Sequence, residues 1–135
     1  MTSAEKYQRD KVRLKEYRDR RKFEALSTGL LYGRPVEQVI YDRYKYSAER
    51  RNVVFELNLE EFKSYWKKPC SYCGGEIQTI GLDRIDNDLG YIKENITPCC
   101  TVCNLSKRGM LAEDYISHCV KVAKKTRERL LDRPV

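Results

Sequence analysis

Two Cys-x-x-Cys pairs constrain this sequence more than any other feature. The first pair is Cys70 and Cys73, followed by two glycines, and the second pair is Cys100 and Cys103, with twenty-six residues between Cys73 and Cys100. Two such pairs supply four thiolates, the tetrahedral ligand set of a structural Zn²⁺ site. The binding free energy of such a site is also folding free energy, because the unfolded chain has no preformed site. We therefore expect a small fold held by one structural zinc ion.

The remaining cysteines lead to different expectations. Cys99 adjoins Cys100 and competes with it for the fourth ligand position, but only Cys100 completes a Cys-x-x-Cys pair. Cys119 lies on the apolar side of a C-terminal helical pattern, which predicts a core thiol. A redox Cys-x-x-Cys motif needs a βαβ frame that we do not find, and the spacings match iron–sulfur motifs poorly. Zinc is therefore the favoured ion.

The N-terminal stretch has no apolar run of the kind that a signal peptide needs. No run approaches the ~18 apolar residues of a membrane helix. We therefore expect an intracellular, cytoplasmic protein with no membrane partner, and in that compartment cysteines serve metals more often than disulfides.

The net charge of +7 is distributed unevenly along the chain. Residues 1–52 carry 14 Lys and Arg against 8 Asp and Glu, residues 53–104 carry 5 against 8, and residues 105–135 carry 8 against 4. Basic ends favour a polyphosphate partner, because each cation near a phosphate releases a counterion. The same charges would also keep exposed helices soluble, so charge alone leaves both interpretations open.

Hydrophobic periodicity predicts helices at both ends of the chain and short strands in the middle, which is an α+β pattern. The predicted helices cover residues 4–26 and 35–50, a segment capped by Asn58, a segment that starts near Cys103, and a C-terminal segment through Leu130. The predicted strands cover residues 53–57, 78–85 and, more loosely, 91–96.

A further pattern lies between and beside the cysteine pairs. It reads GLDRIDNDLGYIKENITP over residues 81–98 and CNLSK over residues 103–107. With these motifs, residues 53–116 resemble the HNH endonucleases, or ββα-metal nucleases, and in particular the variety common in phage genomes. The resemblance implies a small ββα-metal core braced by the four-cysteine zinc site, with basic helical N- and C-terminal extensions.

The resemblance also divides the chain into three parts. Residues 1–52 are expected to form a basic helical extension, and residues 53–116 the zinc-braced core. Residues 117–135 are expected to form a C-terminal helix packed on that core.

The resemblance implies a set of catalytic residues. Asp83 matches the metal-binding acid at the end of the first strand, and Asn104 matches the metal ligand on the helix. Asn95 matches the residue that holds the loop and orients the general base. A catalytic Mg²⁺ or Mn²⁺ follows from this set, since these ions prefer oxygen ligands. The implied activity is hydrolysis of phosphodiester bonds, with double-stranded DNA as the expected partner.

Arg84 stands where the family has its general-base histidine. Arginine stays protonated in proteins, so Arg84 cannot take a proton from water, and we expect it to grip the scissile phosphate. Lys107 and Arg108 are the other expected nucleic-acid contacts. His118 is the one histidine of the chain, and a lone helical histidine is more often a surface residue than a base.

Three interpretations therefore stay open. In the favoured one, the chain is a metal-dependent endonuclease, with Asp86 or Asp88 as base or additional ligand. In the second, it is a zinc-containing nucleic-acid-binding protein that does not cleave, such as a regulator or a subunit of a nucleoprotein complex. In the third, the carboxylates only form turns, which explains Asp86 and Asp88 before Gly90 equally well.

Overall fold

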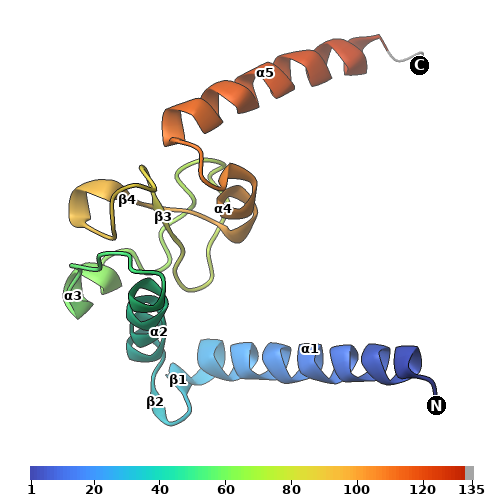
Figure 1. Cartoon of the computed structure of the whole chain (residues 1–135), viewed down its shortest axis with the longest axis vertical. Coiled ribbons are helices and arrows are strands. Elements are labelled where there is room, and N and C mark those ends of the chain that lie inside the picture. Colours follow the sequence, from blue (N-terminus) through green and yellow to red (C-terminus); the bar gives the residue numbers. More distant parts are fainter. Residues whose placement is uncertain (133–135) are drawn as a thin grey trace. The chain divides into compact units, whose positions relative to one another are not determined.

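The computed structural model describes residues 1–132, which contain five α-helices, one 3₁₀ turn and two small antiparallel sheets (Figure 1). The chain divides into two compact units, of which the first is Met1–Tyr46 and the second begins at Ser47. The predicted three-part division stays a prediction, and residues 133–135 of its last part lie outside the described residues. No helix within residues 1–132 combines the length and the apolar character needed to cross a membrane.

The first unit begins with the long helix α1, Ser3–Thr28, which confirms the predicted N-terminal helix. Thr2 and Glu5 form a reciprocal capping box at its start. Gly29 ends the helix in the left-handed conformation with φ 71°, and its amide donates to the carbonyl of Ala25. Ala25 is the one buried residue of α1, so this helix is held to the rest of its unit only near its C-terminal end.

A tight hairpin follows α1 and was not predicted. Strand β1, Leu30–Leu31, pairs with β2, Arg34–Pro35, through a turn in which Tyr32 and Gly33 both have positive φ. Such two-residue turns match the twist of the strands they join. Pro35 was expected in the first turn of a helix, but helix α2, Val36–Arg50, starts directly after it.

The second unit opens with the last turn of α2, and an irregular segment follows it. The predicted strand 53–57 is wrong, because only an isolated bridge joins Phe55 to Tyr91. The predicted helix after Asn58 is confirmed as α3, Leu59–Lys63, with the Asn58 and Glu61 capping box in place.

A hairpin and a helix form the centre of this unit (Figure 1). Strand β3, Leu82–Arg84, pairs antiparallel with β4, Ile96–Pro98, and the 3₁₀ turn η1, Lys93–Asn95, precedes β4. Helix α4, Thr101–Lys107, follows at once. The predicted strand 78–85 is shorter than expected, and the predicted strand 91–96 is displaced to 96–98. This ββα arrangement rests on a small core that includes Phe62, Leu82 and Ile96.

Helix α5, Ala112–Leu131, confirms the predicted C-terminal helix but not its burial. Tyr115 is its one buried residue, and Ile116 and Val120 of the expected apolar stripe are about half exposed. Cys119 is exposed as well, so its prediction as a core thiol is wrong. The helix packs on the unit through its first turns, and beyond them its apolar side has no described neighbour to cover it.

Gly81 gives a direct test of how closely the hairpin approaches the second cysteine pair. A Cβ at this position would collide with the backbone carbonyl of Cys99, whose amide donates to the carbonyl of Gly81. We expect Gly81→Ala to lower the free energy of unfolding by about 1–3 kcal/mol, as overpacking does. Gly109→Ala is the matched control, because its Cβ would meet nothing closer than 3.7 Å. Equal denaturant midpoints for both variants would contradict this close approach.

Candidate metal centre and active site

The four predicted zinc ligands lie together in the structure. The sulfurs of Cys70, Cys73, Cys100 and Cys103 are all within 4.8 Å of one another, and those of Cys73 and Cys100 are 3.8 Å apart. A tetrahedral ion with Zn–S distances of about 2.3 Å needs sulfurs about 3.8 Å apart, so the donor set fits zinc in number, type and spacing. These four side chains form a cluster that can hold a metal ion such as zinc.

Local backbone geometry orients the two sulfurs of each cysteine pair toward the cluster. In the first pair, Gly74 has φ 74° and its amide donates to the carbonyl of Cys70, which closes a tight turn. In the second pair, Cys100 caps helix α4, and its sulfur accepts the amide of Cys103 at 3.4 Å. Ser71 ties the two pairs together, because its amide and its hydroxyl both donate to the carbonyl of Pro98, each at 2.9 Å.

The thiols of the cluster differ in their acidity. Burial opposes ionisation of Cys70, but amide hydrogen bonds from Cys100, Cys73 and Tyr72 outweigh it and lower the pKa of Cys70 to about 6. Burial, and then hydrogen bonding to the neighbouring thiols, raises the pKa of Cys103 to about 12. One thiolate therefore forms readily, and a bound dication would favour the other three, since metals deprotonate the thiols that bind them.

Cys99 is not part of the cluster. Its side chain is buried, its thiol donates to the carbonyl of Cys100 at 3.3 Å, and burial raises its pKa. Of the two adjacent cysteines, the structure brings only Cys100 to the other sulfurs.

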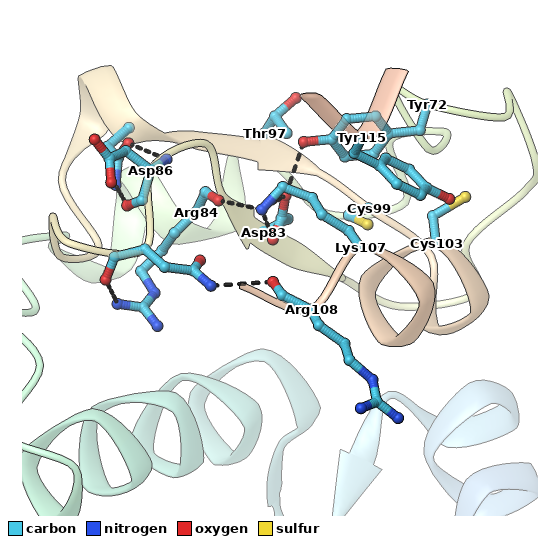
Figure 2. Close-up of polar contacts among 12 residues, drawn as sticks. Tyr72, Asp83, Arg84, Asp86, Thr97, Cys99, Cys103, Lys107, Arg108 and Tyr115 are labelled. Carbon is cyan, nitrogen blue, oxygen red and sulfur yellow. Dashed lines mark hydrogen bonds and ion pairs between the residues drawn. The ribbon is translucent and has the colours of Figure 1, made fainter. Parts of the chain in front are cut away.

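A buried ion pair joins the hairpin to α4 (Figure 2). Asp83 on β3 is 4% exposed and Lys107 on α4 is fully buried, and the Lys107 ammonium lies 3.3 Å from one carboxylate oxygen of Asp83. The ammonium also donates to the carbonyl of Arg84 at 3.1 Å. Lys107 therefore points inward in this structure, and its predicted phosphate contact stays a prediction.

Tyr72 completes this network, and the sequence did not single it out. It lies between the first two cysteines, and its hydroxyl donates to Asp83 at 2.8 Å. Burial, followed by the hydrogen bond to Asp83, raises the pKa of Tyr72, so the phenol stays a donor. Its ring meets Tyr115 of α5 edge to face, with centroids 5.5 Å apart, and the Tyr115 hydroxyl bonds to Ser106. The sequence signal for Tyr72 was an aromatic residue inside a metal-binding turn, because its neighbours Ser71 and Cys73 are exposed.

Arg84 holds the loop that follows β3. One of its terminal nitrogens donates to the carbonyls of Asn87 and Leu89, at 2.9 and 3.1 Å, and its guanidinium lies 5.5 Å from the ring centroid of Tyr91. These contacts stabilise the loop and engage one of the two terminal nitrogens of the guanidinium, so the predicted phosphate contact of Arg84 stays a prediction.

Asn95 holds the same loop from the other side. Its side-chain oxygen accepts the amide of Asp86, and its side-chain nitrogen donates to the carbonyls of Asp86 and Gly90. The carboxylate of Asp86 accepts the amide of Asp88, which is ordinary turn chemistry. The loop between β3 and η1 is thus fixed by Arg84 and Asn95 together.

Asn104 and Arg108 lie at the surface of α4. Asn104 is exposed one turn before Lys107, and no hydrogen bond within residues 1–132 joins its side chain to Asp83. Arg108 is exposed at the C-cap of α4, and its carbonyl accepts the side-chain amide of Asn87 at 3.0 Å. The structure therefore joins Asp83 to Lys107, while Asn104 and Arg108 are exposed and their predicted ligand contacts stay predictions.

Comparisons with known proteins agree with this geometry at the level of the fold. The solved structure of the rare-cutting HNH restriction endonuclease PacI matches with a TM-score of 0.56 and 19% sequence identity, over 72% of this chain and 83% of that one. No family model matches the sequence. The chain is 34% identical over 90 residues to the uncharacterized protein R423 of Acanthamoeba polyphaga mimivirus. The matched segment covers 64% of this chain but only 17% of the length of R423.

The fold is therefore HNH-like, with mixed helices, small sheets and a cysteine cluster, and the predicted fold class is confirmed.

The choice of Cys100 over Cys99 can be tested by metal content. Native mass spectrometry of the reduced protein should show one zinc ion in the wild type and in Cys99→Ser, because Cys99 is not one of the four residues whose sulfurs form the cluster. Cys100→Ser should bind zinc more weakly, since it removes one of the four sulfurs. Zinc loss in Cys99→Ser with retention in Cys100→Ser would contradict the assignment.

The buried ion pair predicts a large and non-additive effect on stability. Lys107→Met leaves Asp83 buried without its counter-ion, which typically costs about 3–5 kcal/mol, and Asp83→Asn/Lys107→Met should be more stable than that single variant. Lys125→Met is the control, because its ion pair with Glu128 is exposed and should matter little. Denaturant titration of these three variants and of Asp83→Asn alone completes the double-mutant cycle, and additive effects at Asp83 and Lys107 would contradict the pair.

Proposed function

We propose that this chain is an HNH-type endonuclease that hydrolyses phosphodiester bonds in DNA with the help of a divalent metal ion. The observation that carries the proposal is the junction of β3 and α4 at Asp83 and Lys107, in a fold shared with a DNA-cutting enzyme. This junction positions an acid on the strand and an exposed amide, Asn104, on the helix.

The zinc ion has a structural role in this proposal. Four sulfur ligands leave no coordination position open for water or substrate, so chemistry needs a second ion. The zinc cluster instead fixes Tyr72, which donates to Asp83, and the start of α4, the helix that carries Lys107.

A hard ion such as Mg²⁺ or Mn²⁺ would be held by the carboxylate of Asp83 and the amide oxygen of Asn104, which are oxygen donors of the kind these ions prefer. When bound, it lowers the pKa of a coordinated water and stabilises the leaving oxygen. The fit is incomplete, because the Lys107 ammonium already neutralises Asp83 and the ion must compete with it.

The residues around this site support slow cleavage. Arg84 and Asn95 keep the loop in place, and Arg108 is exposed for contact with a phosphate. No described histidine lies in the network, and Tyr72 has a raised pKa that keeps it protonated. The absence of a positioned general base typically costs about 10²–10⁴-fold in rate.

A second function is favoured by the same contacts. Both oxygens of Asp83 already have partners, and Arg84 donates to loop carbonyls. A protein with this arrangement can bind nucleic acid through its basic surface without cutting it. This second function is the non-cleaving, zinc-containing nucleic-acid-binding protein, which the sequence also allowed as an alternative to the endonuclease.

Asn104 offers the cleanest test of cleavage, because its side chain is exposed and its loss leaves no buried charge. Purified protein is incubated with supercoiled plasmid and Mg²⁺ or Mn²⁺, and nicked and linear products are followed over time. We expect Asn104→Ala to slow cleavage by at least about tenfold, since even an outer-shell partner of a metal is worth 10- to 100-fold. Leu105→Ala, an exposed neighbour on the same helix, should cleave like the wild type.

The outcomes separate the two functions. Equal cleavage by the wild type and Asn104→Ala would contradict the assigned metal site. Salt-sensitive DNA binding with no cleavage by the wild type in either metal would support the non-cleaving alternative.

A further inference from the structure

Helix α1 presents a long surface that the proposed active site does not use. Residues 1–20 are all exposed, and within the first unit only Ala25 of this helix is buried. The helix carries nine Lys and Arg against five Asp and Glu. At 1.5 Å per residue, its 26 residues extend over about 39 Å.

The basic residues of α1 are not spread evenly around it. Successive residues of an α-helix are about 100° apart, so residues three, four and seven apart share a side. Eight of the nine bases fall into two rows on roughly opposite sides of the helix: Lys11, Lys15, Arg18 and Lys22 in row one, and Lys6, Arg9, Arg13 and Arg20 in row two.

The two faces between these rows differ in charge. One face holds Tyr7, Leu14 and Tyr17, which are 64%, 56% and 44% exposed. Three of the five acids, Glu5, Glu16 and Asp19, lie together on the opposite face. Asp10 is the exception on the tyrosine face, and Glu24 is paired with Arg21 at 3.0 Å.

This distribution of charges on α1 is complementary to the phosphates that line a DNA groove. The major groove of B-DNA admits one α-helix, with a phosphate backbone along each of its two walls. A helix in that groove needs cations on two opposite sides, a face without clustered acids toward the base edges, and its acids toward solvent.

We propose that α1 lies in the major groove of duplex DNA, with its two basic rows on the two phosphate walls and the tyrosine face toward the bases. Other occupants fit less well. A second copy of α1 would bring two cationic surfaces together, and an anionic membrane favours a broader apolar face than two tyrosines and one leucine provide. The inference uses the DNA partner of the proposed function, but it does not depend on cleavage.

The first test neutralises each row separately in the full chain. Binding to a short duplex is measured by fluorescence anisotropy at several salt concentrations, without added divalent metal. Each lost phosphate contact should reduce the slope of log K against log[salt] by about 0.9, so the four Gln substitutions of either row should reduce it by about 3–4. Glutamine is a good helix former, and far-UV circular dichroism checks that α1 persists.

The control for this test removes the same charge elsewhere. Four exposed bases of α5, Lys121, Lys124, Arg127 and Arg129, are replaced by Gln. This variant should retain most of the slope. Equal losses in the α1 and α5 variants would overturn the proposal, because they would reflect net charge alone. A loss for only one row would overturn the placement between two walls.

The second test asks which face of α1 meets DNA. Leu14 and Val12 are aliphatic, similarly exposed at 56% and 54%, and lie on opposite faces of the helix. Leu14→Glu places a negative charge toward the groove and should weaken duplex binding at least tenfold, whereas Val12→Glu should weaken it by less than threefold. Equal effects would overturn the assigned face. Wild-type affinity for phosphatidylserine vesicles that exceeds its affinity for duplex would overturn the choice of DNA.

These measurements separate this inference from the proposed function. Duplex binding that depends on α1 without any plasmid cleavage supports the inference and contradicts the endonuclease. Plasmid cleavage that is unchanged in both row variants, with unchanged salt slopes, overturns the inference and leaves the endonuclease standing.

Discussion

Four sulfur atoms within 4.8 Å of one another are the constraint on which the second unit depends. They come from a loop after α3 and from the start of α4, so an ion among them joins segments that are about thirty residues apart. The unit has few fully buried apolar side chains, and a core of this size gains much of its stability from such a metal. The hairpin of β3 and β4 lies between the two cysteine pairs and is positioned by both.

The proposed metal centre and the proposed active site are physically connected. Tyr72 lies inside the first cysteine pair and donates to Asp83, and Lys107 lies one turn after the second pair and faces the same carboxylate. A change in the cluster would therefore move two of the three groups of this network. The same network also explains why Asp83 is buried: its charge is balanced by an ammonium, and each of its oxygens has a hydrogen-bond partner.

Spacing and capping rules predicted the elements whose causes are local. The cysteine pairs and the Asn58 cap of α3 depend on a few neighbouring residues, and they lie where expected. The short strands were displaced because their pairing is set by contacts far along the chain. The partners of Arg84 and Lys107 could not be predicted either, since a basic side chain looks the same in sequence whether it faces a phosphate, a loop carbonyl or a buried carboxylate.

Zinc K-edge X-ray absorption of the reduced, folded protein tests the central claim most directly, because it reports the identity and distance of the atoms around the metal. The account predicts four sulfur neighbours at about 2.3 Å and no oxygen or nitrogen ligand. A zinc ion with fewer than four sulfur neighbours, or folded protein that contains no zinc, would contradict it.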